Sequence, residues 1–402
     1  MSAANNFDVA IAGAGPAGSS MAIRLALAGA RVLLVEEKRF PRAKLCGEFI
    51  SPECLAHFKN LGVMAQMRAA GGVSLAETIF YSRRGRSLSV PSEWFQSGSA
   101  ALGLSRREMD QQLLARARAL GVVVLEGSHA SQLIADPATV CGLRVKAGCL
   151  TRDYQALVTV DATGRTRALA RHLDRPRAKR KKNVRPMVAF KAHFESARLA
   201  PDTCEIYFYE RGYGGLSSVE GGLSNLCFMV AARDVRRFGS DPELVLRKLV
   251  HKNVRAAYTL GEARAVSPWL SVSLESFGPR TLTPALGLLT VGDAASFIDP
   301  FTGSGMLLAL ESGALAAETI RQHLSLLRQG SGFATMAGAY RAEYLRRFQR
   351  RLRVSGLLRR AAGVPHLDEV AILLLGSSAG LRRKLTRATR HSTSREVKFT
   401  NL

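Results

Sequence analysis

The sequence predicts an α/β fold in which a parallel sheet covered by helices is interrupted by a mostly antiparallel sheet and followed by a helical C-terminal region. Three observations lead to this fold class. A strand, a glycine-rich turn, a helix and a second strand follow one another at the N-terminus, and strand-like segments within 186–275 alternate with glycine-rich turns. A further apolar strand at 288–291 runs into another glycine turn and a helix. The strands of one parallel sheet are therefore scattered along the chain, with a second sheet inserted between them.

The composition is typical of a large globular protein. The 402 residues, 47% of them hydrophobic, provide for two or three domains. Apolar runs such as 371–375 are far shorter than the ~18 residues that a membrane span requires. Residues 1–8 lack the basic and apolar regions of a secretory signal, and the six cysteines show no metal-like spacing with histidine. We expect free thiols, no metal and a cytoplasmic location.

The N-terminal unit is a β-α-β unit with a dinucleotide-binding fingerprint. Residues 8–12 form a buried strand, 19–28 an apolar helix, and 31–36 a second parallel strand. The turn after the first strand carries the three glycines of a G-x-G-x-x-G motif: Gly13, Gly15 and Gly18.

Each fingerprint residue has a physical purpose. Gly13 permits the tight turn, Gly15 lets the backbone approach a pyrophosphate, and Gly18 lets helix and sheet pack closely. The helix N-terminus then presents free N–H groups to the phosphates. Glu36, at the end of the second strand, is expected to accept hydrogen bonds from ribose hydroxyls. Its carboxylate repels a 2′-phosphate, so the unit favours FAD or NAD over NADP.

Three separated motifs resemble the superfamily of FAD-dependent aromatic hydroxylases and geranylgeranyl reductases, over roughly residues 6–360. The first is the glycine fingerprint with Glu36. The second is Val291-Gly292-Asp293-Ala294-Ala295 followed by Asp299-Pro300-Phe301-Thr302-Gly303-Ser304-Gly305. The third is Lys44-Leu45-Cys46-Gly47-Glu48, placed after Phe40-Pro41-Arg42 as in the geranylgeranyl-reductase-like branch.

The resemblance implies a domain organisation. A Rossmann-type FAD-binding domain is expected from 1–185 and 276–330, with a mostly antiparallel β-sheet substrate domain at 186–275. A basic helical region is expected at 331–402.

The resemblance also implies roles for individual residues. Asp293 takes the place of a residue that accepts a hydrogen bond from the ribityl chain of FAD, and Arg106 the place of an arginine directed at the flavin region. Cys46 is expected near the flavin, where a thiol can donate a proton to carbon, and Glu48 is a candidate general acid or base. The remaining implied cofactor-binding residues are Gly13, Gly15, Ala17, Gly18, Glu36, Arg42, Asp161, Gly292, Pro300, Gly303, Ser304 and Gly305.

Two chemistries share this scaffold; we expect the first, and the second is the alternative. The first is hydroxylation of a hydrophobic secondary metabolite, a polyketide or an aromatic, through a flavin hydroperoxide. The second is reduction of carbon-carbon double bonds of a lipid, as in geranylgeranyl reductases. Polyprenyl reductases carry a Trp and a Pro where this chain has Ser217, Ser218 and Glu220, which favours hydroxylation, whereas Cys46 favours reduction. A flavin-binding protein without activity is a third alternative, and the absence of a Trp-x-Trp-x-Ile-Pro segment disfavours halogenation.

The inserted sheet is expected to form the floor of an apolar substrate pocket. The aromatic candidates, of which only one or two are expected to touch a ligand, are Phe190, Phe194, Tyr207, Tyr209 and Phe228. No second G-x-G-x-x-G motif follows, so we expect NADH or NADPH to bind only transiently as electron donor.

The net charge of +25 comes largely from two segments. Residues 175–185 hold seven Lys/Arg and no acid, and residues 341–395 hold fourteen against three acids. No zinc-finger, helix-turn-helix or RNA-binding signature accompanies them, so we expect no nucleic-acid partner. In the second segment Tyr340, Tyr344, Phe348 and Leu352 form an apolar stripe beside a basic face. This pattern indicates either a helix packed on the body or a contact with an anionic membrane surface, at the inner face of the membrane.

Overall fold

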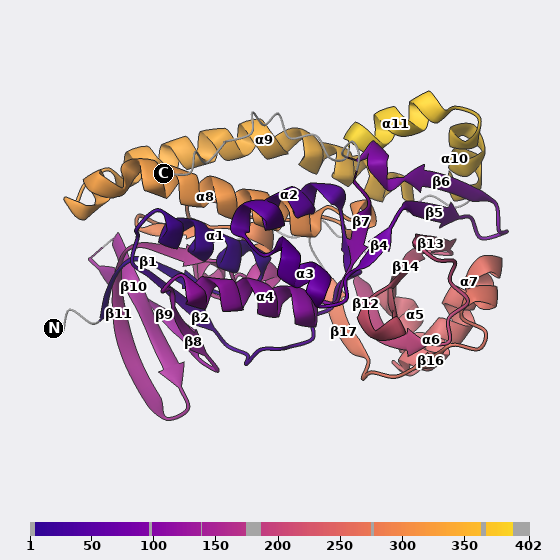
Figure 1. Ribbon diagram of the computed structural model, residues 1–402, viewed down its shortest axis with the longest axis horizontal. Helices are drawn as coiled ribbons and strands as arrows, with labels where there is room; N and C mark the ends of the chain where they lie inside the picture. The colour runs from indigo at the N-terminus through magenta and orange to yellow at the C-terminus, as the bar shows by residue number, and fades with distance from the viewer. Residues whose placement is uncertain are drawn as a thin grey trace.

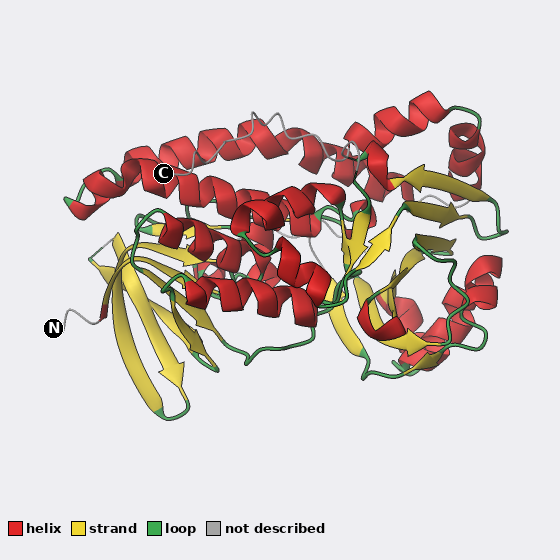
Figure 2. Cartoon of the chain, in the orientation of Figure 1, coloured by secondary structure: helices red, strands yellow, loops and turns green. Residues whose placement is uncertain are grey.

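The computed structural model describes residues 5–95, 99–137, 139–173, 186–274, 277–362 and 367–388. A helix-covered parallel sheet and a separate, mostly antiparallel sheet lie side by side. The long C-terminal helices lie over the first, and the two short last helices lie beside the second (Figures 1 and 2). The basic segment 175–185 lies outside the described residues.

The first sheet contains the two strands that the N-terminal fingerprint predicts, β1 and β2. Strand β1 pairs in parallel with β2 and β11, β2 with β8, and β11 with β19, while β9 and β10 form an antiparallel ribbon on β11. Their bounds are β1 Asn6–Ala12, β2 Val32–Glu36, β8 Val123–Glu126, β9 His129–Asp136, β10 Thr139–Ala147, β11 Leu150–Asp161 and β19 Leu288–Thr290.

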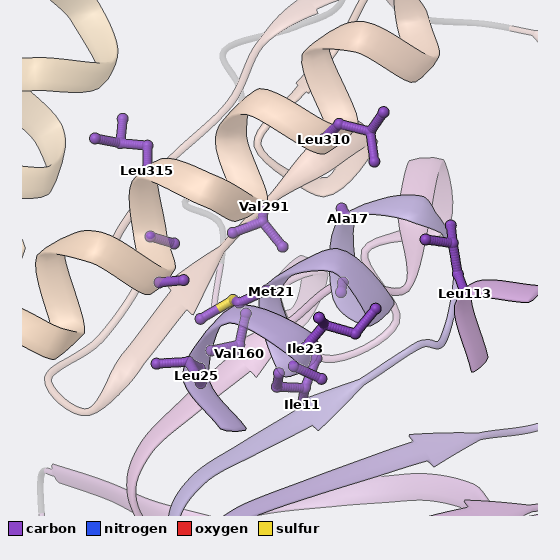
Figure 3. Packing of buried hydrophobic residues seen from close by; sticks show 14 of the residues in the cluster. Ile11, Ala17, Met21, Ile23, Leu25, Leu113, Val160, Val291, Leu310 and Leu315 are labelled. Atoms are coloured by element: carbon purple, nitrogen blue, oxygen red, sulfur yellow. The ribbon is translucent and has the colours of Figure 1, made fainter. Parts of the chain in front are cut away.

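The helices over this sheet enclose the main core. Met21 and Leu25 of α1 belong to one buried cluster with Val160 of β11, Val291 directly after β19, and Leu315 of α8 (Figure 3). Sequence segments almost 300 residues apart are thus joined by apolar burial, the dominant stabilising term in such a core. The helices of this layer are α1 Pro16–Leu27, α2 Pro52–Leu61, α3 Met64–Ala69, α4 Arg106–Ala119, α8 Gly305–Arg328 and α9 Phe333–Ala362.

The apolar stripe of the basic C-terminal segment belongs to this core. Tyr340, Tyr344 and Phe348 of α9 are buried in the cluster that contains α1 and α8, and the Tyr340 hydroxyl donates to the carbonyl of Thr290 at 2.8 Å. The stripe therefore packs on the body of the protein, and it is unavailable to a membrane. None of the described helices is long and apolar enough to span one.

The inserted sheet lies beside the first and is larger than the range 186–275. Its order is β16-β12-β15-β14-β13-β5-β6, with β17 on β12, so β5 and β6 join it from far upstream. Strand β5 pairs with β13 in parallel, which local sequence patterns do not reveal. The bounds are β5 Glu77–Tyr81, β6 Ser87–Pro91, β12 Met187–Glu195, β13 Thr203–Tyr209, β14 Gly212–Ser218, β15 Ser224–Ala231, β16 Arg264–Ala265 and β17 Leu270–Leu274.

Smaller elements complete the second domain and the connections. The short helices α5 to α7 share a core with the outer face of the inserted sheet. A three-stranded sheet, β3-β7-β4, links the two domains, and helices α10 and α11 contact β6. Their bounds are α5 Ala232–Arg237, α6 Pro242–Leu249, α7 Val254–Thr259, β3 Phe49–Ile50, β4 Val73–Leu75, β7 Ala101–Gly103, α10 Leu367–Gly376 and α11 Ala379–Ala388.

Candidate functional site

A cavity of 1590 Å³ lies between the two domains. Its wall includes the glycine turns of the first sheet, the loop 42–49, and strands β13 to β15 of the second. Pockets for a single small molecule usually measure about 300–1,000 Å³. The cavity therefore has room for a large cofactor together with a second, mostly apolar molecule.

The fingerprint turn has the geometry that close approach of a ligand requires. Gly13 has φ +102°, and a Cβ on Gly18 would lie 1.9 Å from the Gly13 carbonyl oxygen, so neither position admits a side chain. A Cβ on Gly15 would have Nη2 of Arg106 as its nearest neighbour, 3.9 Å away, so this position faces open space. Gly15 also lies directly before the first turn of α1, and Pro16 and Ala17 of that turn line the cavity.

Charged residues line the wall beside this turn. A Glu36 carboxylate oxygen accepts from the backbone N–H of Ala14 at 2.9 Å, which fixes the acid at the strand end. Asp110 receives two hydrogen bonds from the Arg106 guanidinium, at 2.9 and 2.7 Å, and one from Arg42 at 3.1 Å. Burial opposes the charge on Arg106, but the pairing with Asp110 and a contact with Cys46 raise its pKa overall. Arg106 therefore stays a cation in the wall of the cavity.

The second glycine turn lies against the first. A Cβ on Gly292 would lie 2.9 Å from Cβ of Ala17, so the two motifs meet only because this residue is glycine. The next residue, Asp293, lines the cavity, and its carboxylate has no hydrogen-bond partner within the described residues. Burial raises the pKa of Asp293, although Lys44 and Arg106 oppose this effect. A carboxylate on a cavity wall without a donor is suited to bind hydroxyl groups of a ligand.

The loop that carries Cys46 is held from three sides. The Cys46 thiol lines the cavity and interacts with the Arg106 guanidinium. The backbone N–H of Glu48 approaches its sulfur at 3.4 Å, and the side-chain amide of Asn225 donates to the Cys46 carbonyl at 3.1 Å. The Ser217 hydroxyl donates to the carbonyl of Gly47 at 3.3 Å. The inserted sheet therefore positions this thiol.

Glu48 lies at the centre of a buried charge cluster. One carboxylate oxygen accepts from the Arg106 backbone N–H at 2.8 Å and pairs with the Lys191 ammonium, and the other lies 2.7 Å from Nε2 of His193. Burial alone raises the pKa of Glu48, but the His193 hydrogen bond and the Lys191 charge lower it overall. Its backbone has φ +54°, which a non-glycine residue adopts only when its surroundings hold it there. Glu48 is therefore a buried acid that Arg106, Lys191 and His193 hold in place.

The apolar part of the cavity wall is aromatic. The rings of Phe80, Phe208 and Tyr213 surround that of Phe301, with centroids 6.3, 5.7 and 5.2 Å from it. The Tyr213 hydroxyl donates to the Asp299 carboxylate at 2.7 Å, which joins the inserted sheet to the turn that follows Pro300.

Comparison with known proteins decides what this site is. The model of the family described as FAD binding domain matches residues 6–354. The chain belongs to the FAD-binding oxidoreductases. It is 30% identical to menaquinone reductase of Mycobacterium tuberculosis over 387 residues, covering 89% of this chain and 88% of that protein. It is 26% identical to digeranylgeranylglycerophospholipid reductase of Methanosarcina mazei, covering 80% and 76%.

A solved structure agrees in fold. A flavin-dependent brominase variant superposes with a TM-score of 0.81 and 20% identity, covering 96% of this chain and 95% of that one. At this identity the likeness concerns the fold alone. The family match and the two reductase relatives show that this FAD-dependent oxidoreductase is an enzyme.

The residues present fit FAD. The open position at Gly15 and the N–H groups of α1 suit its pyrophosphate, the Glu36 carboxylate suits the ribose, and the unpartnered Asp293 carboxylate suits the ribityl hydroxyls. Arg42 and Arg106 add positive charge nearby. Pro300, Gly303 and Gly305 line the same cavity, at the start of α8.

Two expected cofactor contacts need correction. Asp161 is fully buried and points away from the cavity, because one carboxylate oxygen accepts from the N–H and hydroxyl of Thr163 and the other from the N–H groups of Leu169 and Ala170. It stabilises the turn after β11. The Ser304 hydroxyl is also buried and bonds to the Thr302 hydroxyl at 2.7 Å, so its side chain does not reach the cavity.

One of the five aromatic candidates lines the cavity, in agreement with the one or two that the sequence analysis expects. Phe190, Phe194, Tyr207 and Phe228 pack on the opposite face of the sheet, in the core under α5 to α7, and only Tyr209 of the five candidates lines the cavity. Strand alternation predicts two faces but does not say which one meets the first domain.

Three site residues were missed by sequence reasoning. Lys191 and His193 lie on β12, far in sequence from the Glu48 carboxylate that they bind. Their spacing of two residues, in a strand of otherwise apolar character, is the one signal that a polar partner lies opposite. Lys44, within the cysteine motif, lines the cavity beside the arginines.

Replacing Asp293 tests the second turn. Asp293→Ala is expected to raise the Kd for FAD about tenfold to a hundredfold, because hydrogen bonds to a charged acceptor contribute about 1.5–3 kcal/mol. Asp293→Asn keeps one acceptor oxygen and should lose less. Quenching of flavin fluorescence during titration measures both, and an unchanged Kd for Asp293→Ala would remove this residue from the FAD site.

Proposed function

We propose that this enzyme reduces a carbon-carbon double bond in a long hydrophobic substrate of isoprenoid type. The observation that carries the proposal is the place of Cys46: a thiol on the wall of a large, mostly apolar cavity, held by the inserted sheet beside a permanent cation. Both relatives named above are reductases, and each aligns with more than three quarters of the chain.

The proposed reaction needs one hydride and one proton. FAD, when bound and reduced by NADH or NADPH, supplies the hydride to one carbon of the double bond. The S–H bond of Cys46 breaks as its proton goes to the other carbon, and the electrons of that bond stay on sulfur as a thiolate. The Arg106 guanidinium beside the sulfur stabilises this charge, and a proton from solvent restores the thiol.

The surrounding side chains exclude water and orient the substrate. The rings of Phe80, Phe208 and Phe301 offer an apolar surface to a hydrocarbon chain. Glu48 keeps the cysteine loop in place through Lys191 and His193, so that it acts on the reaction only through position.

Cys46 itself provides a direct test. Cys46→Ala is expected to lower kcat about a hundredfold or more while FAD stays bound, because general acid catalysis contributes about 10²–10⁴. Cys227→Ala, a second thiol on the cavity wall, is the matched control and should stay near the wild-type rate. Full activity of Cys46→Ala, measured as anaerobic oxidation of NADH or NADPH with menaquinone, would exclude the thiol from the reaction.

Hydroxylation of a polyketide or aromatic substrate is the second candidate. It is supported by Ser217 and Glu220. Polyprenyl reductases carry a Trp and a Pro in this stretch, whereas this chain has polar residues there. Glu220 accepts from the backbone N–H of Ser105 at 2.8 Å, at the start of α4. The same assay separates the candidates: turnover that continues without oxygen supports reduction, whereas turnover that requires oxygen supports hydroxylation.

A further inference from the structure

The C-terminal helices α10 and α11 have two different faces. They pack beside β6 at the edge of the inserted sheet (Figure 1). Their inner face lines the cavity through six residues: Glu369, Ile372, Leu375, Arg382, Leu385 and Thr386. These helices are therefore part of the boundary between the cavity and the outside.

Polar anchors fix which face turns inward. Glu369 of α10 accepts from the backbone N–H of Arg84 at 3.1 Å, in the turn between β5 and β6. Arg382 of α11 donates to the Ser89 carbonyl at 3.3 Å, and its guanidinium lies 5.5 Å from the centroid of the Trp94 ring. Both helices are thus held against the inserted sheet on one side, and the opposite side of each helix faces outward.

The outward face combines leucines with cations. Leu373, Leu374 and Leu381 are 59%, 61% and 49% exposed, which is unusual for three large apolar side chains within nine residues. Arg383, Lys384 and Arg387 of α11 are also exposed. We call these six residues the outer patch.

We propose that the outer patch docks on an anionic lipid bilayer and brings the substrate cavity to the membrane. Leucines beside lysine and arginine on a surface helix are typical of segments that lie in the interface of a bilayer. The cations complement anionic headgroups, and the net charge of +25 favours the same surface. The apolar stripe of α9 is buried, so α10 and α11 replace it as the part of the chain expected to contact a membrane.

This proposal rests on the proposed function in one respect: it takes the substrate to be a molecule that dissolves in lipid. A molecule dissolved in the bilayer would reach a cavity lined by Ile372 and Leu375 without crossing water, since those residues belong to the helix that carries Leu373 and Leu374. Docking itself is measured without turnover, so its failure is distinguishable from failure of the proposed reaction.

Vesicle cosedimentation of the full-length, FAD-loaded protein tests the docking. The wild type should bind vesicles of phosphatidylcholine mixed with phosphatidylglycerol, and bind less at high salt or to phosphatidylcholine alone. Arg383→Gln/Lys384→Gln/Arg387→Gln is expected to weaken binding about a hundredfold, since each cation contributes about 1 kcal/mol near such a surface. Leu373→Ser/Leu374→Ser/Leu381→Ser should weaken it about tenfold or more.

Matched variants elsewhere control for charge and apolarity. Lys59→Gln/Lys146→Gln/Arg152→Gln removes three exposed cations from the first domain, and Leu150→Ser removes an exposed leucine from the β10–β11 turn. Both should bind like the wild type, and flavin absorbance confirms that every variant is folded. Wild-type binding that is absent, or equal in all variants, would overturn the proposal. A dimer in light scattering that only the leucine triple variant dissociates would assign the outer patch to a second copy of the chain instead.

Discussion

Gly15→Val is expected to abolish FAD binding while the protein stays folded. The branched side chain would occupy the space where the backbone meets the pyrophosphate, yet nothing in the protein lies closer to its Cβ than Arg106 at 3.9 Å. Loss of two or three charge-assisted hydrogen bonds, about 4 kcal/mol or more together, corresponds to a Kd at least about a thousandfold higher. Flavin fluorescence titration measures the affinity, and circular dichroism reports the fold.

Two further variants make this result specific. Gly15→Ala adds a single methyl group in open space and should bind FAD with an intermediate Kd. Gly18→Ala places its Cβ 1.9 Å from the Gly13 carbonyl oxygen, so it should destabilise the fold itself. Stoichiometric FAD in Gly15→Val would show that the cofactor does not approach this turn.

Lys191→Met is expected to destabilise the protein by about 3–5 kcal/mol. It removes the ammonium from a fully buried Glu48 carboxylate, and breaking a buried pair by deleting one partner costs about this much. Urea unfolding at neutral pH measures the change. Glu48→Gln/Lys191→Met removes both charges and should recover part of the loss, whereas the exposed control Lys146→Met should stay within about 0.5 kcal/mol of wild type.

The charge cluster around Glu48 also predicts how the stability of the protein varies with pH. The pKa of Glu48 is lower in the folded protein than its ordinary value of 4.5. Its contribution to stability is therefore present above pH 4.5 and is lost as the pH falls through the lower folded pKa. The difference in stability between wild type and Glu48→Gln should shrink on acidification in that range. A difference that does not vary with pH would mean that Glu48 is not held as an ion.

Local sequence predicts those parts of the site in which the contributing residues all lie in one short segment of the chain. Gly13, Gly15 and Glu36 lie within a single β-α-β unit, so spacing alone places them together. The role of Asp293 follows instead from the resemblance of segment 291–305 to a flavin-binding motif. These positions line the cavity as expected.

The parts that sequence does not predict depend on contacts between distant segments. Strand β12 meets the cysteine loop across 143 residues, and nothing local to Lys191 indicates this neighbour. Asp161 likewise ends a strand, but its carboxylate accepts four hydrogen bonds from the residues that follow, three from backbone N–H groups and one from a hydroxyl. The pairing of β5 and β6 with the second sheet is also a contact between distant segments, which local sequence does not predict.

The most direct test of the proposed reaction is a single turnover in D₂O without oxygen. The wild-type enzyme, loaded with FAD and chemically reduced, is mixed with menaquinone, and the product is analysed by mass spectrometry. In D₂O the Cys46 thiol and the N–H of chemically reduced flavin both exchange with solvent, so the product should carry two added deuterium atoms on carbon, and Cys46→Ala should form it far more slowly. No product without oxygen, and a product carrying one oxygen atom once oxygen is admitted, would contradict reduction and support hydroxylation.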